Sequence, residues 1–125
     1  MDYSKLSDFE INAAVFENLH GGAPDYKEGD GGAMVLISYE GDVVGGDAVE
    51  VEVERGVFNP CNNPADAWPI IVDNLLRMTP VVHHGSVSWI ACRGDYGVSH
   101  ENPLRAAMIV FLMMQESDNV QDNPA

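Results

Sequence analysis

The sequence has few positive charges. Six Lys and Arg residues stand against 20 Asp and Glu residues among 125, which gives a formal net charge of −14. Non-specific affinity for nucleic acids comes from cations that neutralise phosphates, so this balance argues against direct binding to DNA or RNA. An acidic chain can instead bind basic proteins or occupy a nucleic-acid site as a mimic of the polyanion, although high net charge also serves solubility alone.

Cysteine is scarce as well. Cys61 and Cys92 are the two cysteines, and they form neither a C-x-x-C pair nor a metal-ligand spacing. His83 and His84 are adjacent, and neighbouring side chains on a strand point to opposite sides, which disfavours joint chelation of one metal ion. We therefore predict no disulfide, no metal and no cofactor. A nucleophilic pair of Cys92 with a histidine lacks any local sequence motif.

Long hydrophobic runs are also missing. The longest, residues 106–114, has nine residues, whereas a helix needs about 20 apolar residues to span a bilayer. Residues 1–5 have neither the basic stretch nor the apolar stretch of a secretory signal peptide. We expect a cytoplasmic protein that contacts no membrane.

Three helix starts are encoded locally. Ser7, followed three residues later by Glu10, forms a capping box for a helix that ends near His20. The pairs Asn63-Pro64 and Asn102-Pro103 each place a capping asparagine before a proline at the first helical position. The apolar spacing then predicts a second helix to about residue 78 and a third over residues 103–116.

Strands are indicated at residues 34–39, 48–54 and 87–92, and a loop at residues 21–32. Valines 49, 51 and 53 alternate with glutamates, which predicts a strand with one wet face and a hairpin with residues 34–39. The length fits one domain. We expect an α+β fold over residues 1–116, with three helices packed on a small, mainly antiparallel sheet of about three strands, and a disordered polar tail over residues 117–125.

Glu50, Glu52 and Glu54 form a candidate acidic face. Side chains on one strand face are about 7 Å apart, which suits a solvated row better than an acid/base pair held in a cleft. The row is a candidate surface for a basic partner, and solubility is the alternative interpretation.

The stretch between the second strand and the second helix is a candidate recognition loop. Its amides and aromatic rings make either a structural turn or a small recognition pocket, and the residues concerned are Phe58, Asn59, Asn62, Asn63 and Trp68. The third helix is apolar on both faces, with Arg105 the one charged residue between positions 103 and 115. Such a helix lies in the centre of a core or pairs with a second copy of the chain.

Three stretches resemble a known family in the same order along the chain. Residues 6–15 are similar to its opening helix, residues 58–71 to its central aromatic-x-Pro and Pro-Ile-Ile motif, and residues 89–108 to its closing Trp-x-Ala and Pro-Leu-x-Ala-Ala-Met motif. This is the pattern of the NinX-like family of small proteins from lambdoid bacteriophages and prophages. Two positions depart from it, because Ile109 stands where the family often has Arg and Trp68 where it often has Gly.

The resemblance implies phage or prophage origin and a location inside the bacterial host cell, and it assigns no enzymatic activity. Since the residues form no catalytic constellation, we expect a non-enzymatic accessory protein that binds another, unidentified protein. The alternative is a small enzyme or small-molecule binder that uses the loop at residues 58–71. A deep polar pocket beside Trp68 would favour the alternative, and an exposed apolar patch would favour protein binding.

Overall fold

The computed structural model describes residues 1–121, apart from the side chains of residues 42, 44 and 118–121. The described residues form three α-helices, six strands and two short 3-10 helices. In chain order the elements are η1 (Tyr3–Lys5), α1 (Asp8–His20), β1 (Tyr26–Glu28), η2 (Asp30–Gly32), β2 (Met34–Val44), β3 (Asp47–Phe58), α2 (Pro64–Asp73), β4 (Arg77–His83), β5 (Ser86–Arg93), β6 (Tyr96–His100) and α3 (Pro103–Gln121).

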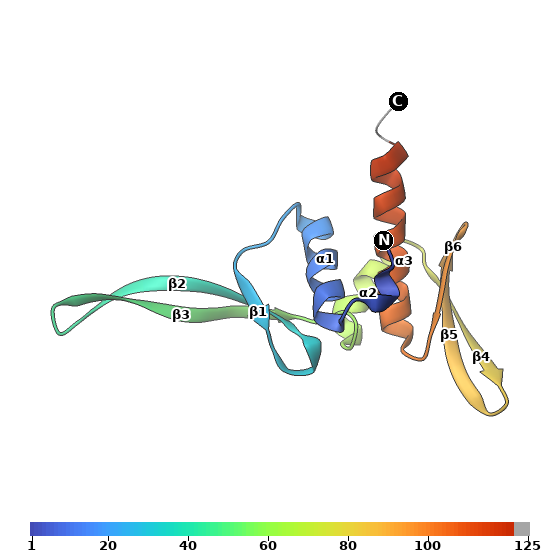
Figure 1. Ribbon diagram of the computed structural model, residues 1–125, viewed down its shortest axis with the longest axis horizontal. Coiled ribbons are helices and arrows are strands. Elements are labelled where there is room, and N and C mark those ends of the chain that lie inside the picture. The colour runs from blue at the N-terminus through green and yellow to red at the C-terminus, as the bar shows by residue number, and fades with distance from the viewer. Residues whose placement is uncertain (122–125) are drawn as a thin grey trace.

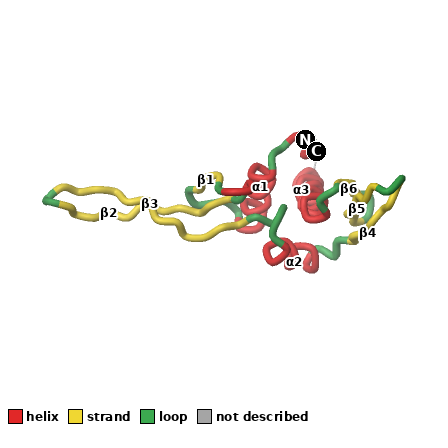
Figure 2. The backbone as a smooth tube through the Cα atoms, turned by 90° about the horizontal axis from the view of Figure 1, so that it is seen from below, coloured by secondary structure: helices red, strands yellow, loops and turns green. Residues whose placement is uncertain are grey.

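The helices form the centre of the molecule, with one sheet on each side (Figures 1 and 2). One sheet has the order β1-β2-β3 and the other β4-β5-β6, and all neighbouring strands are antiparallel. The expected α+β class with three helices is confirmed. The expectation of a single sheet is wrong, because residues 87–92 lie in β5, which pairs with β4 and β6 rather than with β2 or β3.

The core forms around α3. From Ala106 to Leu112 every residue is at most 4% exposed, because α1, α2, β5 and β6 all pack against this stretch. Other elements of the same chain therefore bury both apolar faces of α3 over this stretch. The helix continues to Gln121, beyond the predicted end near residue 116. Residues 117–121 of the predicted tail are therefore helical, and residues 122–125 lie outside the described residues.

All three predicted helix starts are confirmed. The Ser7 hydroxyl accepts a hydrogen bond from the Glu10 N–H, and the Glu10 carboxylate accepts one from the Ser7 N–H, both at 3.1 Å. Asn63 accepts from the Ala65 N–H at 3.0 Å, and Asn102 accepts from the Leu104 N–H at 3.0 Å. These bonds satisfy N–H groups that have no partner inside the helix.

The second helix is shorter than predicted, and the loop before the first strand is more ordered. Leu75 has a φ of 54°, so the chain leaves α2 after Asp73 and residues expected to be helical enter β4. Pro80 is accommodated because β4 is an edge strand, where a missing N–H leaves no ladder partner unpaired. Residues 21–32, predicted as a loop, contain β1 and η2.

The hairpin of β2 and β3 extends away from the body (Figure 1). The predicted pairing is confirmed, but the strands are longer and meet at Gly45-Gly46, whose φ values of 61° and 90° suit a two-residue hairpin turn. We call residues 39–52, the outer part of this hairpin, the arm. Every described residue of the arm is exposed. The predicted dry face at Val49 and Val51 is therefore wrong, since these side chains are 42% and 44% exposed.

Candidate functional site

The candidate recognition loop folds into a tight turn centred on Asn59. The Asn59 carbonyl accepts hydrogen bonds from the N–H groups of Asn62 (3.1 Å) and Asn63 (2.7 Å). Its side-chain Oδ1 accepts from the Nδ2 atoms of Asn12 (2.8 Å) and Asn62 (3.2 Å). The Asn59 N–H donates to Asp66 Oδ2 at 2.9 Å. One residue thereby joins α1, the turn and α2.

Asn12, which bonds to the Asn59 side chain, is fully buried, with an exposed fraction of 0%. Besides Asn59, its Nδ2 donates to the Gly32 carbonyl at 3.0 Å, and its Oδ1 accepts from the Cys61 N–H at 3.0 Å. The sequence analysis missed this residue. The one available sign was a polar side chain between the apolar residues Ile11 and Ala13 on a core-facing helix.

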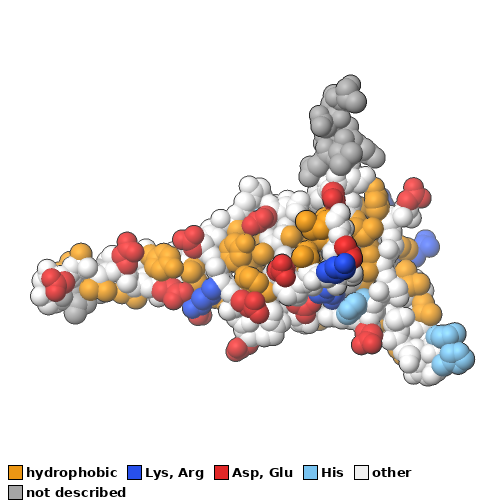
Figure 3. All heavy atoms as spheres, viewed as in Figure 1, with side chains coloured by type: hydrophobic (Ala, Val, Ile, Leu, Met, Phe, Trp, Pro, Cys, Tyr) orange, Lys and Arg blue, Asp and Glu red, His pale blue; other side chains and the backbone are white. Residues whose placement is uncertain are grey.

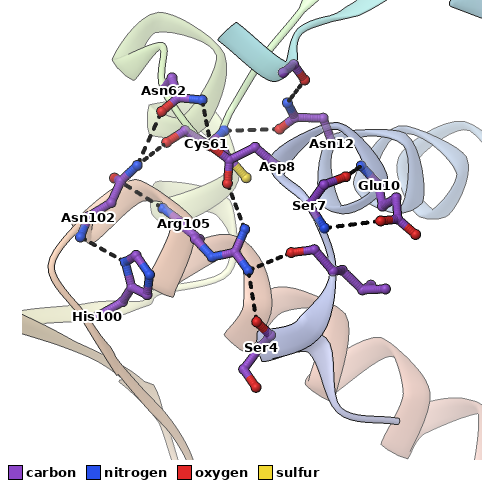
Figure 4. Close-up of polar contacts among 12 residues, drawn as sticks. Ser4, Ser7, Asp8, Glu10, Asn12, Cys61, Asn62, His100, Asn102 and Arg105 are labelled. Carbon is purple, nitrogen blue, oxygen red and sulfur yellow. Dashed lines mark hydrogen bonds and ion pairs between the residues drawn. The ribbon is translucent and has the colours of Figure 1, made fainter. Parts of the chain in front are cut away.

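Asn102 and Asn62 connect the turn to α3 (Figure 4). Asn102 Nδ2 donates to the Cys61 carbonyl at 2.7 Å and to Asn62 Oδ1 at 3.3 Å. Asn62 Nδ2 donates to Asp8 Oδ2 at 3.0 Å. We refer to Asn12, Asn59, Asn62 and Asn102 together as the asparagine cluster.

Arg105 extends the cluster toward the N-terminal segment (Figure 4). Its Nη1 donates to Asp8 Oδ1 at 2.6 Å. Its Nη2 donates to the carbonyls of Leu6 (2.7 Å) and Ser4 (3.3 Å). Arg105 is 8% exposed, so the charge is paired inside the protein and holds the first residues against α3.

The asparagine cluster has the bonding pattern of a structural element. Within the described residues, every buried side-chain nitrogen and oxygen has a hydrogen-bond partner, so no buried polar atom remains for a ligand. The pKa of the Cys61 thiol is raised from 9.0 to about 12, chiefly by burial and also by the nearby Asp8 carboxylate, while Arg105 opposes the shift. The thiol therefore stays protonated near neutral pH, and thiols react as thiolates.

The other residues of the candidate loop serve separate purposes. Asn63 caps α2, and Phe58 is half-buried with its ring centroid 5.5 Å from that of Phe16. Trp68 is 63% exposed and lies outside the asparagine cluster. The structure thus brings Asn59, Asn62 and Asn63 together in the turn but does not gather all five residues at one site.

The candidate acidic face lies at the outer and middle part of β3. Toward the body of the protein, Lys27 Nζ of β1 lies 2.9 Å from Glu52 Oε1 and 3.7 Å from Glu54 Oε1. The hydrogen bond with Glu52 raises the pKa of Lys27. Glu50 lies farther out, opposite Gly41. On the face shown in Figure 3, acidic and hydrophobic side chains alternate along the arm, and Lys and Arg side chains lie only where it joins the body.

A groove of about 560 Å³ lies where the end of α1 meets α2 and α3. It adjoins α2, but Trp68 is not among its lining residues. Those residues are Asn18, Leu19, His20, Phe58, Ala65, Asp66, Pro69, Ile70, Asp73, Asn74, Phe111 and Gln115.

The histidine pair lies at the tip of the β4–β5 hairpin. The expectation that the two rings point to opposite sides is wrong, because His84 has a φ of 50° and the ring centroids are 4.1 Å apart. In the described part of the chain, no group of three or more His, Cys, Asp or Glu residues is placed to hold a metal ion. No helix among these residues is long and apolar enough to span a membrane.

Comparison with known proteins gives one match. A family model described as "Bacteriophage P22, NinX" matches residues 2–115, a range that includes the arm, the asparagine cluster and the groove. No curated protein and no solved structure matches the chain.

Proposed function

Because the chain belongs to the NinX family of bacteriophage P22, we propose that this phage accessory protein acts by binding another protein through its arm. The arm is the observation that carries the proposal. Each of its described residues is exposed, although strands of this length ordinarily lie in a sheet that packs on a core. A surface that projects from the body without serving the core is suited to a partner.

The arm also exposes apolar side chains. Tyr39 is 54% exposed, Val43 72%, Val49 42% and Val51 44%. The register places Tyr39 and Val43 on one face of the arm and Val49 and Val51 on the opposite face. Each face therefore offers a pair of exposed apolar side chains to a partner. A partner that covered these side chains would remove apolar area from water, which supplies the main favourable free energy of association.

The backbone of β2 supports one way of docking. β1 pairs with β2 only from Met34 to Leu36, and the Ile37 N–H donates to the Asp25 carbonyl at 2.9 Å. β1 covers one edge of β2 near the body of the protein. Farther out toward the hairpin turn, the same edge of β2 has no neighbouring strand among the described residues. An extended segment of the partner can continue the sheet there by β-strand addition.

The charge of the arm defines the chemistry of the partner. Residues 39–52 contain five acidic residues and neither Lys nor Arg. A basic segment would be drawn to this surface, and the attraction would act mainly on the rate of association. Pairing of two arms is opposed by the same charges, so a second copy of this chain fits the surface poorly.

The alternative function, an enzyme or small-molecule binder that uses the loop at residues 58–71, has weaker support. Asn59 and Asn62 form hydrogen bonds within the asparagine cluster, and Trp68 lies apart from them.

Affinity capture from phage-infected bacteria tests the proposal with two variants. In the first, residues 39–52 are replaced by Asn-Gly, so that Ser38 and Val53, which already pair, flank a two-residue turn. In the second, Glu50, Glu52 and Glu54 are all changed to Gln. We expect the wild type to retain a basic protein that the shortened variant loses.

Association kinetics with the captured protein separate charge from shape. The triple Glu→Gln variant should associate about tenfold more slowly at low salt, with a smaller change in the dissociation rate. The matched control changes three exposed acids away from the acidic face, Glu17→Gln, Asp95→Asn and Glu101→Gln, and should associate faster than the triple variant. Equal retention of the partner by the shortened variant would refute the proposal.

A further inference from the structure

The groove at the ends of α1 and α2 lies outside the arm and has the size of a ligand site. Its volume of about 560 Å³ falls within the range of roughly 300–1,000 Å³ that is typical of small-molecule pockets. α1 contributes its last turn, α2 contributes one side and its end, and α3 contributes Phe111 and Gln115. The groove is therefore formed by helices that the core holds in place.

Part of the lining is apolar and firmly packed. Ile70 is 4% exposed and Phe111 is 3% exposed, and both belong to the main hydrophobic core. Phe58 packs against Phe16. These side chains give the groove a preformed apolar floor, which can hold the hydrocarbon part of a ligand at little cost in ordering.

The remaining lining is polar, and His20 and Gln115 supply N–H donors beside acceptors. Asp66 and Asp73 line the groove, and none of its described lining residues is Lys or Arg. The Nδ2 atoms of Asn18 and Asn74 already donate to the carbonyls of Ala14 and Ile70, at 2.8 Å each, so each side chain keeps its Oδ1 as an acceptor and one N–H as a donor. The last turns of α1 and α2 add partial negative charge, while the first turn of α2, which contributes Ala65 and Asp66, adds partial positive charge.

From this lining we propose that the groove binds an organic cation, an ammonium or guanidinium group carried on an apolar body. Such a group is a cationic donor, which complements the Asp66 and Asp73 carboxylates, and its body matches the apolar floor. Anions are disfavoured by Asp66 and Asp73. The cation can be a free small amine, or the side chain of an Arg or Lys on a bound protein.

Titration with benzylamine, followed by the backbone amide shifts of Leu19, Asp73 and Asn74, tests the proposal. Benzylamine is a cation near neutral pH, and benzyl alcohol is its neutral counterpart of similar shape. We expect saturable millimolar binding of benzylamine, as suits a ligand of this size, and about tenfold weaker binding of benzyl alcohol, which lacks the charge. Equal binding of both compounds, or no saturable shift with either, would overturn the proposal.

The variant Asp73→Asn tests whether benzylamine binds in the groove, because Asp73 is one of its lining residues. Asp73 is exposed, so its replacement should leave the melting temperature unchanged. We expect benzylamine to bind about fivefold more weakly to this variant, the effect of losing a partly exposed ion pair. The control Asp95→Asn removes one negative charge in the β5–β6 turn and should bind like the wild type. Equal affinity of both variants would contradict the proposed site.

N-acetyl-arginine amide distinguishes the two sources of the cation. Tighter binding of this compound than of benzylamine supports a side chain of a bound protein, and the reverse order supports a free amine. None of these results bears on the arm, because Asp73 lies outside residues 39–52, so failure here and failure of the proposed function can be told apart.

Discussion

Asn12 shows how one residue can fix the relative positions of distant segments. Its side chain bonds to the Gly32 carbonyl, the Asn59 side chain and the Cys61 N–H, although these partners are separated from it by 20 to 49 positions. Because Asn12 is fully buried, water cannot replace it in these bonds. The side chain therefore specifies the fold as well as stabilising it.

Asn12→Ala should lower the free energy of unfolding by about 2–4 kcal/mol, because the buried Cys61 N–H and the half-buried Gly32 carbonyl would lose their hydrogen-bond partner. Urea denaturation measures this change. The control is Asn18→Ala on the same helix, which loses one exposed bond to the Ala14 carbonyl and should change stability by only about 0.5 kcal/mol. Similar losses in the two variants would show that burial of the cluster contributes nothing.

The two cysteines should differ in reactivity. Cys61 is buried with its pKa raised to about 12, whereas Cys92 is half-buried. We expect iodoacetamide at pH 8 to modify Cys92 in the folded protein and to reach Cys61 only after unfolding. Mass spectrometry of the alkylated peptides measures the outcome, and rapid modification of both sites in the native state would contradict it.

The raised pKa of Cys61 also predicts an alkaline loss of stability. The unfolded chain releases this proton near pH 9.0, while the folded chain holds it until about pH 12. A folded-state pKa above the unfolded value gives stability that is fully present below pH 9 and is lost as the pH rises toward 12. Replacing Cys61 with Ala should flatten the pH dependence of the unfolding free energy in this window.

At the scale of elements, the arm and the root of the same hairpin, the part next to the body that includes residues 34–38 of β2, have different roles. At the root, Ile37 is 6% exposed and Met34 is fully buried, so β2 begins within the core. The arm itself has no buried side chain among its described residues. The two strands thus combine a structural half with a half that is available to a partner.

The variant that replaces residues 39–52 with Asn-Gly should keep the stability of the wild type within about 1 kcal/mol, since surface changes away from core contacts have small effects. Thermal and urea unfolding measure this. Ile37→Ala at the root provides the contrast and should cost about 2–4 kcal/mol through the cavity it leaves. A large loss on shortening would mean that the arm stabilises the body, which would weaken its proposed role as a separate contact surface.

On the scale of the whole molecule, charge separates the candidate partners. The net charge of −14 repels phosphates, and the six cations are spread along the chain. Two of them, Lys27 and Arg55, pair with glutamates of the first hairpin, and Arg105 pairs with Asp8. Of the other cations, Arg77 and Arg93 are exposed and line one hollow together, and two charges are few for binding a phosphate backbone.

Duplex DNA should therefore show no binding in a mobility-shift assay at physiological salt, because phosphate contacts need clustered Lys and Arg. The assay includes low salt, where any electrostatic binding would be strongest. The captured basic protein serves as the positive control, and its binding should weaken as salt rises. Tight, salt-sensitive binding to DNA would contradict both the charge argument and the proposed function.

Pairing of two copies through α3 stays a prediction. Residues 106–112 are buried within the chain, so a contact with a second copy would have to use the half-buried residues beyond them, such as Met113 and Met114. An oligomer formed this way would leave the arm free.

The sequence alone determined the features that depend on neighbours in the chain. Ser7 with Glu10, Asn63 with Pro64 and Asn102 with Pro103 placed three helix starts correctly, because a cap bonds to backbone only two or three residues away. The alternation of Val and Glu placed a strand for the same reason, since its period of two is a local property of the backbone. The family was likewise recognisable from the order of its motifs along the chain, without a structure.

Only the tertiary structure decided which surfaces are buried and which residues meet. Alternation cannot tell whether a face has a neighbour, so it could not show that Val49 and Val51 lie on an exposed arm. Helical spacing could not show that the chain leaves α2 at Leu75 for a second sheet. Asn12 with Cys61, and Arg105 with Asp8 from 97 positions away, come together because the core closes around α3, and such contacts depend on the whole chain rather than on any local pattern.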